Sequence, residues 1–213
     1  MFAGHFGLAA GVKALDSTVL SKRRATGTAQ SAPSRPDVPL WALMLSTQLL
    51  DVMFVFMVIA GVESFGGGAG YGQGWIHAYY THSLTGALLL ATGAGLLSAR
   101  WWGRQGGLII AATVFSHWLL DLLVHRPDLP ILPGNLGGFP LLGFGLWNMP
   151  AVSIAIEALL VIGGAALYFA SVLARARGTA TNRAGERGSA LVAGGVMSVL
   201  LVLSLATSVL GIG

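Results

Sequence analysis

The sequence predicts an all-α fold: a polytopic membrane helix bundle of about six transmembrane helices, with both termini outside. Composition is the first indication, because the 213-residue chain is 54% hydrophobic and only 9% charged, whereas soluble domains carry roughly 25% charged residues. The second is that the apolar residues gather in stretches of about 20, the length at which a helix crosses a bilayer. We therefore expect one membrane domain over residues 1–213.

Six apolar stretches account for the predicted helices in chain order. The first, residues 2–20, is interrupted by Lys13 and Asp16. It forms either a short spanning helix with Lys13 snorkelling or a re-entrant helix, and we expect it to span. The other five are long enough to cross the bilayer: residues 39–62, 82–99, 106–124, 146–173 and 189–210. The last transmembrane helix, 189–210, carries no charged residue.

The basic residues set the orientation of these helices. Eleven of the twelve lie near the end of, or after, the first, third or fifth stretch, and positively charged loops stay in the cytoplasm. We therefore expect residues 21–38 to be a mobile cytoplasmic linker and 174–188 a second one. Residues 63–81 and 125–145 become outer loops. Because the positive charge gathers in these linkers, it does not indicate nucleic-acid binding.

A stripe of ionisable residues ending the fourth stretch is the strongest indication of a functional site. His117, Asp121 and His125 are spaced four residues apart, so on a helix they project from one face. Ionisable groups are expensive at membrane depth and usually mark functional sites. In the predicted topology all five histidines of the chain lie on the outer side.

Polar residues on the other helices predict a metal site on this outer side. The chain has no cysteine, so a divalent ion would take nitrogen and oxygen ligands; zinc suits such a set best, and manganese and magnesium are alternatives. The candidate ligands are His5, Asp51, His82, His117 and Asp121. For Asp51 taken singly, a hydrogen bond that only holds two helices together is an equal alternative.

His125, Arg126 and Glu157 are the candidate catalytic residues. His125 lies about 12 Å along the helix axis from His117, so it shares the same ion only if the helix ends there, as Pro127 favours. Otherwise it holds a second ion, acts as an acid or base, or orients the substrate. Arg126 suits a phosphate ester, with an Asp128 ion pair or a lipid headgroup contact as the alternative. Glu157 is a general acid or base, or a structural group.

Several short motifs follow one another in a familiar order. They are GHF at 4–6, QLLD at 48–51, THS at 81–83, SHWLLD at 116–121, HRPDLP at 125–130 and GLWN at 145–148. In this order they resemble the bacterial membrane-bound, metal-dependent hydrolases related to the LexA-binding inner-membrane hydrolase group. The resemblance covers most of residues 1–173. It implies a multi-pass protein of the inner membrane and six candidate site residues: His5, Asp51, His82, His117, Asp121 and His125.

Three functions are compatible with these residues. The first is a metal-dependent hydrolase at the outer, periplasmic surface, acting on a lipid or a phosphate ester. The second is a non-catalytic membrane subunit that keeps the fold and docks to a larger membrane complex. The third is a proton-coupled carrier, which the lack of an internal repeat disfavours. The expected partners are the lipid bilayer and other membrane subunits.

Overall fold

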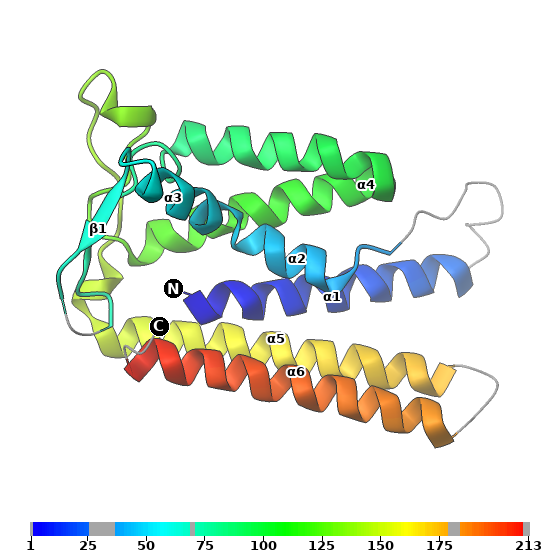
Figure 1. Ribbon diagram of the computed structural model, residues 1–213. Coiled ribbons are helices and arrows are strands. Elements are labelled where there is room, and N and C mark those ends of the chain that lie inside the picture. The colour runs from blue at the N-terminus through cyan, green and yellow to red at the C-terminus, as the bar shows by residue number, and fades with distance from the viewer. Residues whose placement is uncertain (1, 26–36, 69–70, 179–183, 211–213) are drawn as a thin grey trace.

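The computed structural model describes residues 2–25, 37–68, 71–178 and 184–210, and these are predominantly helical (Figure 1). The helices are α1 (Phe2–Ala25), α2 (Leu40–Thr47), α3 (Leu49–Ile59), α4 (Leu84–Val124), α5 (Pro150–Gly178) and α6 (Ala184–Leu210). A short antiparallel hairpin, β1 (Ser64–Gly66) with β2 (Trp75–His77), lies in the predicted outer loop. The all-α prediction is confirmed at this level, and the hairpin is an addition to it.

Helix α4 is a hairpin of two helical arms that pack against each other. Gly103 interrupts it with φ 66° and ψ 176°, a backbone conformation that only glycine adopts readily, and the chain folds back there (Figure 1). The arms approach closely, since a Cβ on Gly107 would lie 2.5 Å from the Gly95 carbonyl oxygen. The two arms correspond to the predicted stretches 82–99 and 106–124. Ser83 caps the first arm by accepting a hydrogen bond from the Gly86 amide.

The predicted single helix over residues 39–62 is wrong in one respect: it is broken. Helices α2 and α3 meet at Gln48 at an angle of 50°, where Gln48 has left the helical region at φ −105° and ψ 3°. The Gln48 amide bonds to the Leu45 carbonyl, as in a tighter 3₁₀ turn. The break places Asp51 in the first turn of a new helix.

Helix α1 lies at the centre of the packing. One buried cluster joins it to α2 and α4 through Ala9, Leu43 and Val114. A second joins it to α5 and α6 through Ala10, Val161 and Leu201. The first helix is therefore a central element of the bundle, not a marginal one.

Lys13, expected to snorkel, instead bonds to the chain just before α2. Its ammonium group donates to the Asp37 carboxylate at 2.5 Å and to the Val38 carbonyl at 2.7 Å. A buried ammonium needs such partners, and these satisfy it. Of the predicted linkers, residues 26–36 and 179–183 lie outside the described residues, whereas 21–25, 174–178 and 184–188 are helical, at the ends of α1, α5 and α6.

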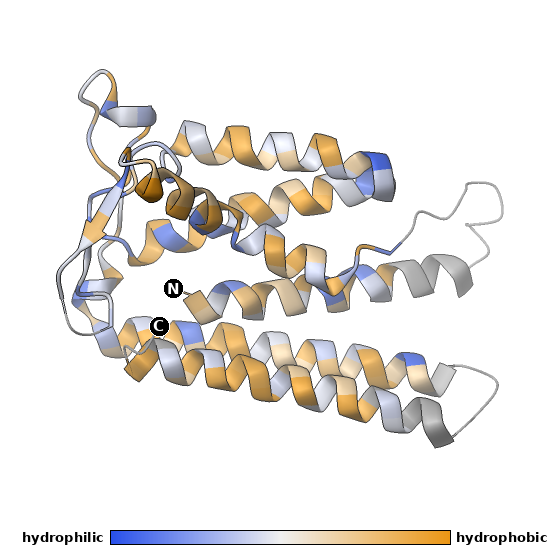
Figure 2. Cartoon of the chain, viewed as in Figure 1, coloured by the Kyte–Doolittle hydropathy of each residue, from blue (hydrophilic) through white to orange (hydrophobic). Residues whose placement is uncertain are grey.

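The outer surfaces of the helices are apolar. Large hydrophobic side chains stay exposed along them, including Ile59 at 77%, Leu96 at 71% and Leu159 at 70%. Figure 2 shows these apolar residues along the helix lengths and hydrophilic ones at the α4 bend. Within the described residues, two helices, Leu84–Val124 and Pro150–Ala176, are long and apolar enough to cross a membrane, and the α2–α3 pair would be a third. These features indicate a membrane protein.

Candidate metal centre

A cavity of about 160 Å³ opens where the start of α1, the start of α3 and the end of α4 meet. Its polar lining is made of His5, Asp51, His82, Asp121 and His125, and its apolar lining includes Phe2, Phe54, Ile76 and Trp147. His117 lies beside it and is fully buried. The fold therefore brings all five predicted ligands and His125 to one place, although they come from separate parts of the chain.

Four of these side chains face one another at the spacing of metal ligands. The His117 Nε2 atom lies 3.0 Å from Asp121 Oδ2 and 3.4 Å from Asp51 Oδ1. The His82 Nε2 atom lies 3.6 Å and 3.3 Å from the same two oxygens. Ligands held at about 2.0–2.1 Å in a tetrahedron are separated by about 3.3 Å. The four distances lie close to this value.

A backbone carbonyl places a hydrogen on one ring nitrogen of His117. Its Nδ1 atom lies 2.5 Å from the Thr47 carbonyl oxygen, which can only accept, so Nδ1 carries the hydrogen. In a neutral imidazole the Nε2 atom then holds a lone pair. This atom is buried without a hydrogen-bond partner, and it faces two carboxylate oxygens.

His82 is oriented in the same way through Thr81 and Glu63. The Thr81 hydroxyl donates to Glu63 Oε2 at 2.8 Å and therefore accepts from His82 Nδ1 at 2.9 Å. Glu63 is 4% exposed and also accepts from the Tyr80 and Thr81 amides. Trp118 donates from its indole nitrogen to the His82 carbonyl. Metal-binding histidines typically donate their second ring nitrogen to such an acceptor.

His125 ends the stripe where the helix ends. It is the residue that caps α4 at its carboxyl end, in an extended conformation, as Pro127 predicts. Its Nδ1 atom bonds to Asp128 Oδ1 at 2.8 Å, which leaves Nε2 3.9 Å from Asp121 Oδ2. The arrangement is that of a histidine base oriented by a carboxylate.

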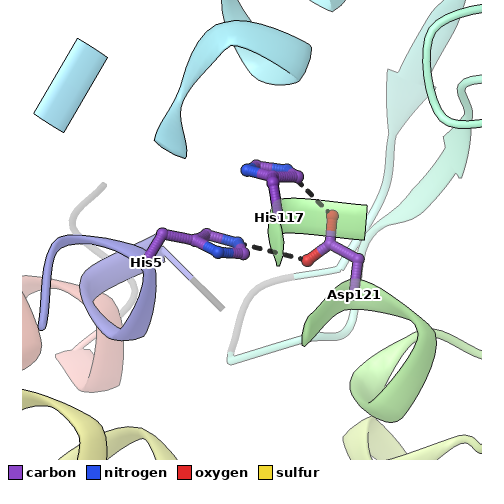
Figure 3. A group of neighbouring side chains, drawn as sticks. All are labelled: His5, His117 and Asp121. Carbon is purple, nitrogen blue, oxygen red and sulfur yellow. Dashed lines mark ion pairs between the residues drawn. The ribbon is translucent and has the colours of Figure 1, made fainter. Parts of the chain in front are cut away.

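His5 approaches the cluster from the first turns of α1. Its Nε2 atom lies 3.3 Å from Asp121 Oδ1, the oxygen that does not face His117. The His5 and His117 rings are stacked, with centroids 3.9 Å apart and planes 10° from parallel. Figure 3 shows the two rings side by side, with Asp121 in contact with both.

Arg126 is placed differently from the predicted anion-binding role. Its guanidinium donates to the Gly72 carbonyl at 2.8 Å, to the Gly74 carbonyl and to the Asn148 side chain. The alternative ion pair with Asp128 is replaced by the His125–Asp128 bond. In the structure, Arg126 therefore forms hydrogen bonds both to the outer hairpin loop and to the segment before α5.

Glu157 lies in a second polar cluster, and the described cavity lining does not include it. This fully buried carboxylate accepts from the Gly4 amide at 3.1 Å and from the Tyr71 hydroxyl at 2.8 Å. Burial raises the pKa of the Tyr71 hydroxyl above its usual range, so Tyr71 stays protonated and donates. Glu157 thereby holds the first turn of α1, one residue before His5.

Glu63, Thr81 and the Thr47 carbonyl contribute to the centre but were not predicted. Glu63 is the only acidic residue in the predicted outer loop 63–81, which was an available signal. Thr81 adjoins a candidate histidine. The role of Thr47 depends on the break between α2 and α3, which the apolar pattern does not show. The fifth histidine, His77, lies in β2 and contacts Trp75.

The fold and the site define a helical membrane protein with a buried His/Asp cluster that could hold a metal ion. Two triads have ligand atoms within 4.8 Å of one another: His5, His117 and Asp121, and Asp51, His82 and His117. No protein-family model, curated protein or solved structure matches the chain.

Proposed function

We propose that this protein is a metal-dependent hydrolase of a bacterial inner membrane, with its site on the periplasmic side. The observation that carries the proposal is the set of facing acceptor atoms. If His117 and His82 are neutral, with their Nδ1 hydrogens donated to Thr47 and Thr81, their Nε2 lone pairs face oxygens of Asp51 and Asp121 at 3.0–3.6 Å. Nitrogen and oxygen lone pairs repel at this distance unless a proton or a metal ion lies between them. Because two rings converge on the same two carboxylate oxygens, the cluster favours one shared divalent ion, such as zinc, manganese or magnesium, over separate protons.

Charge balance supports one divalent ion at the least. The buried Asp121 and the partly exposed Asp51 together carry two negative charges at the cavity. Uncompensated buried charge is very costly. A divalent cation compensates both, while neutral histidines complete its ligand set.

The proposed reaction assigns a role to each side chain of the centre. Asp51, His82, His117 and Asp121 bind the ion, with His5 supporting Asp121. When bound, the ion supplies an activated water and polarises the scissile bond. His125, hydrogen-bonded to Asp128, takes up a proton from the attacking water and returns it to the leaving group. Phe54, Ile76 and Trp147 offer apolar surface, which favours an amphiphile or lipid with a hydrolysable ester over a freely soluble substrate.

The membrane arrangement in this proposal has six spans, counting the two arms of α4 and the broken α2–α3 pair as three. The start of α1, the β-hairpin and the end of α6 lie at one end of the bundle, and the α4 bend lies at the other (Figure 1). Arg100 and Arg104 flank that bend, which supports placing it in the cytoplasm. The motif resemblance to the membrane-bound hydrolases agrees with the residues of the site.

Metal analysis of the purified protein tests the proposal directly. We expect wild type to retain stoichiometric zinc or manganese, and His117→Ala and Asp121→Asn to lose it, because each removes a ligand at the centre of the cluster. His77→Ala serves as the matched control, since this exposed histidine lies in β2. Metal-loaded wild type should also hydrolyse a phosphate or carboxylic ester presented in detergent micelles, and the two ligand variants should not.

Wild type that binds no stoichiometric metal in any buffer would overturn the proposal. If such protein instead co-purifies with large membrane partners at fixed stoichiometry, the non-catalytic subunit becomes the better function.

A further inference from the structure

The stacked rings of His5 and His117 limit how these two residues can bind metal. A histidine ligand holds its ion close to the plane of its ring, along the Nε2 lone pair. The two rings lie 10° from parallel with centroids 3.9 Å apart. One ion cannot lie in both planes, so His5 and His117 do not bind the same ion in this arrangement.

The two oxygens of Asp121 are divided between these two histidines. Oδ1 faces His5 Nε2 at 3.3 Å, and Oδ2 faces His117 Nε2 at 3.0 Å. Both separations suit a nitrogen and an oxygen that share one ion at about 2.1 Å from each. Each oxygen of the carboxylate is thus paired with a different ring, as Figure 3 shows.

The number of ligands also exceeds what one ion takes. Asp51 Oδ1, His82 Nε2, His117 Nε2 and Asp121 Oδ2 already make a set of four, and the activated water would be a fifth ligand of the same ion. His5 remains, 1% exposed, with its Nδ1 atom lacking a hydrogen-bond partner. Its Nε2 atom faces Asp121 Oδ1, so this imidazole is available to bind a second ion.

We propose that the centre holds two divalent ions bridged by the Asp121 carboxylate. Asp51, His82, His117 and Asp121 Oδ2 bind the first ion; His5 and Asp121 Oδ1 bind the second, with water filling its other positions. Two-metal hydrolytic sites keep their ions about 3.5–4 Å apart, and two nearly parallel rings with centroids 3.9 Å apart allow one ion in the plane of each ring. This inference rests on the proposed function. It adds the number of ions and assigns His5 as a ligand of the second ion.

A second ion also specifies the substrate. Two divalent ions outweigh the charges of Asp51 and Asp121 by two positive charges. An anionic ester, most simply a phosphate ester, would compensate this excess by contacting both ions. The apolar cavity wall then favours a phosphate ester that carries a hydrocarbon chain.

Counting bound manganese and recording its spin resonance tests the proposal. Purified full-length protein in detergent is loaded with Mn²⁺ alone and freed of excess. We expect two Mn²⁺ per wild-type chain with an exchange-coupled spectrum, because a bridging carboxylate couples the spins. His5→Ala should hold one Mn²⁺ and give an uncoupled six-line spectrum, whereas Asp121→Asn should lose the coupling and bind both ions more weakly.

The controls separate this proposal from the one on which it rests. His77→Ala should keep two coupled ions, since it removes a histidine outside the cluster. One uncoupled ion in wild type would overturn the two-ion proposal and leave the hydrolase proposal intact, with His5 donating a hydrogen bond to Asp121. No bound ion in wild type would overturn both. The wild-type result decides the matter even if His5→Ala fails to fold.

Discussion

Thr81 has a single hydroxyl hydrogen, and the structure shows where it goes. Because it is donated to Glu63, the same oxygen can only accept from His82. The Glu63 carboxylate therefore fixes, through one hydroxyl, which ring nitrogen of His82 faces Asp51 and Asp121. This positioning role belongs to side chains that do not themselves touch the centre.

Removing the Thr81 hydroxyl should weaken metal binding without removing a ligand. We expect Thr81→Val to raise the metal dissociation constant about 10–100-fold, because His82 loses the acceptor that orients it and Glu63 loses a donor. Competition with a chelator of known affinity measures the change. Thr81→Ser keeps the hydroxyl and should bind metal as wild type does. If Ser and Val variants weaken binding equally, the hydroxyl is not the determinant.

Single residues of the site were partly predictable from the sequence. His117, Asp121 and His82 stand out because ionisable groups are rare in apolar stretches. Glu63 gave only the weak signal of a lone acidic residue in its loop, and Arg126 was expected to bind an anion, because a loop sequence does not show which partners its side chains will contact. The fold buries the first and engages the second in hydrogen bonds to carbonyl oxygens of the hairpin loop.

At the level of elements, the α4 hairpin depends on glycine at its contact. A Cβ on Gly107 would meet the Gly95 carbonyl and Ala99, whereas a Cβ on Gly93 would meet nothing within 4 Å. The second arm carries His117 and Asp121, and His82 immediately precedes the first arm. Close packing of the two arms therefore sets the distance between the ligands that they position.

Substituting these glycines should separate packing from helix propensity. We expect Gly107→Ala to destabilise the protein by about 1–3 kcal/mol, because the added methyl group overpacks the contact. Gly93→Ala should be neutral or stabilising by up to about 1 kcal/mol, because alanine favours the helix. Thermal unfolding in detergent compares the two. Equal effects of both substitutions would show that the contact between the arms does not limit stability.

The sequence predicted the positions of the helices better than it predicted where a helix is broken. Hydrophobic stretches marked where the helices lie, because burial in lipid or protein requires apolar side chains. The break at Gln48 was not predicted, since the residues on both sides of it are equally apolar. Packing against α4, where His117 bonds to the Thr47 carbonyl, provides a partner for backbone at the break.

For the whole molecule, the ends of the bundle differ in chemistry. The β-hairpin and the start of α1 lie toward one end, and the α4 bend lies at the other (Figures 1 and 2). His125 caps the carboxyl end of α4, and Arg100 and Arg104 flank the bend. Such an asymmetry is expected when one end faces the cytoplasm. The topology that follows can be tested without regard to catalysis.

Because the chain has no cysteine, single introduced cysteines report topology cleanly. In spheroplasts, we expect a membrane-impermeant maleimide to label Gln73→Cys, in the hairpin loop, without permeabilisation. Arg100→Cys, at the α4 bend, should be labelled only after the membrane is opened. Both positions are exposed in the structure. The reverse pattern would place the site on the cytoplasmic side and contradict the proposed periplasmic substrate.

By itself, the sequence determined the class of the protein and the chemistry of its site. Apolar composition and the length of the stretches require a membrane helix bundle, and histidines and carboxylates without cysteine restrict the ligands to nitrogen and oxygen. Only the tertiary structure decided how these ligands are grouped. It stacked His5 on His117, divided the oxygens of Asp121 between them and moved Glu157 to another cluster. The reason is that ligand geometry depends on where helices cross and break, and helix crossings are set by packing contacts between residues distant in the chain.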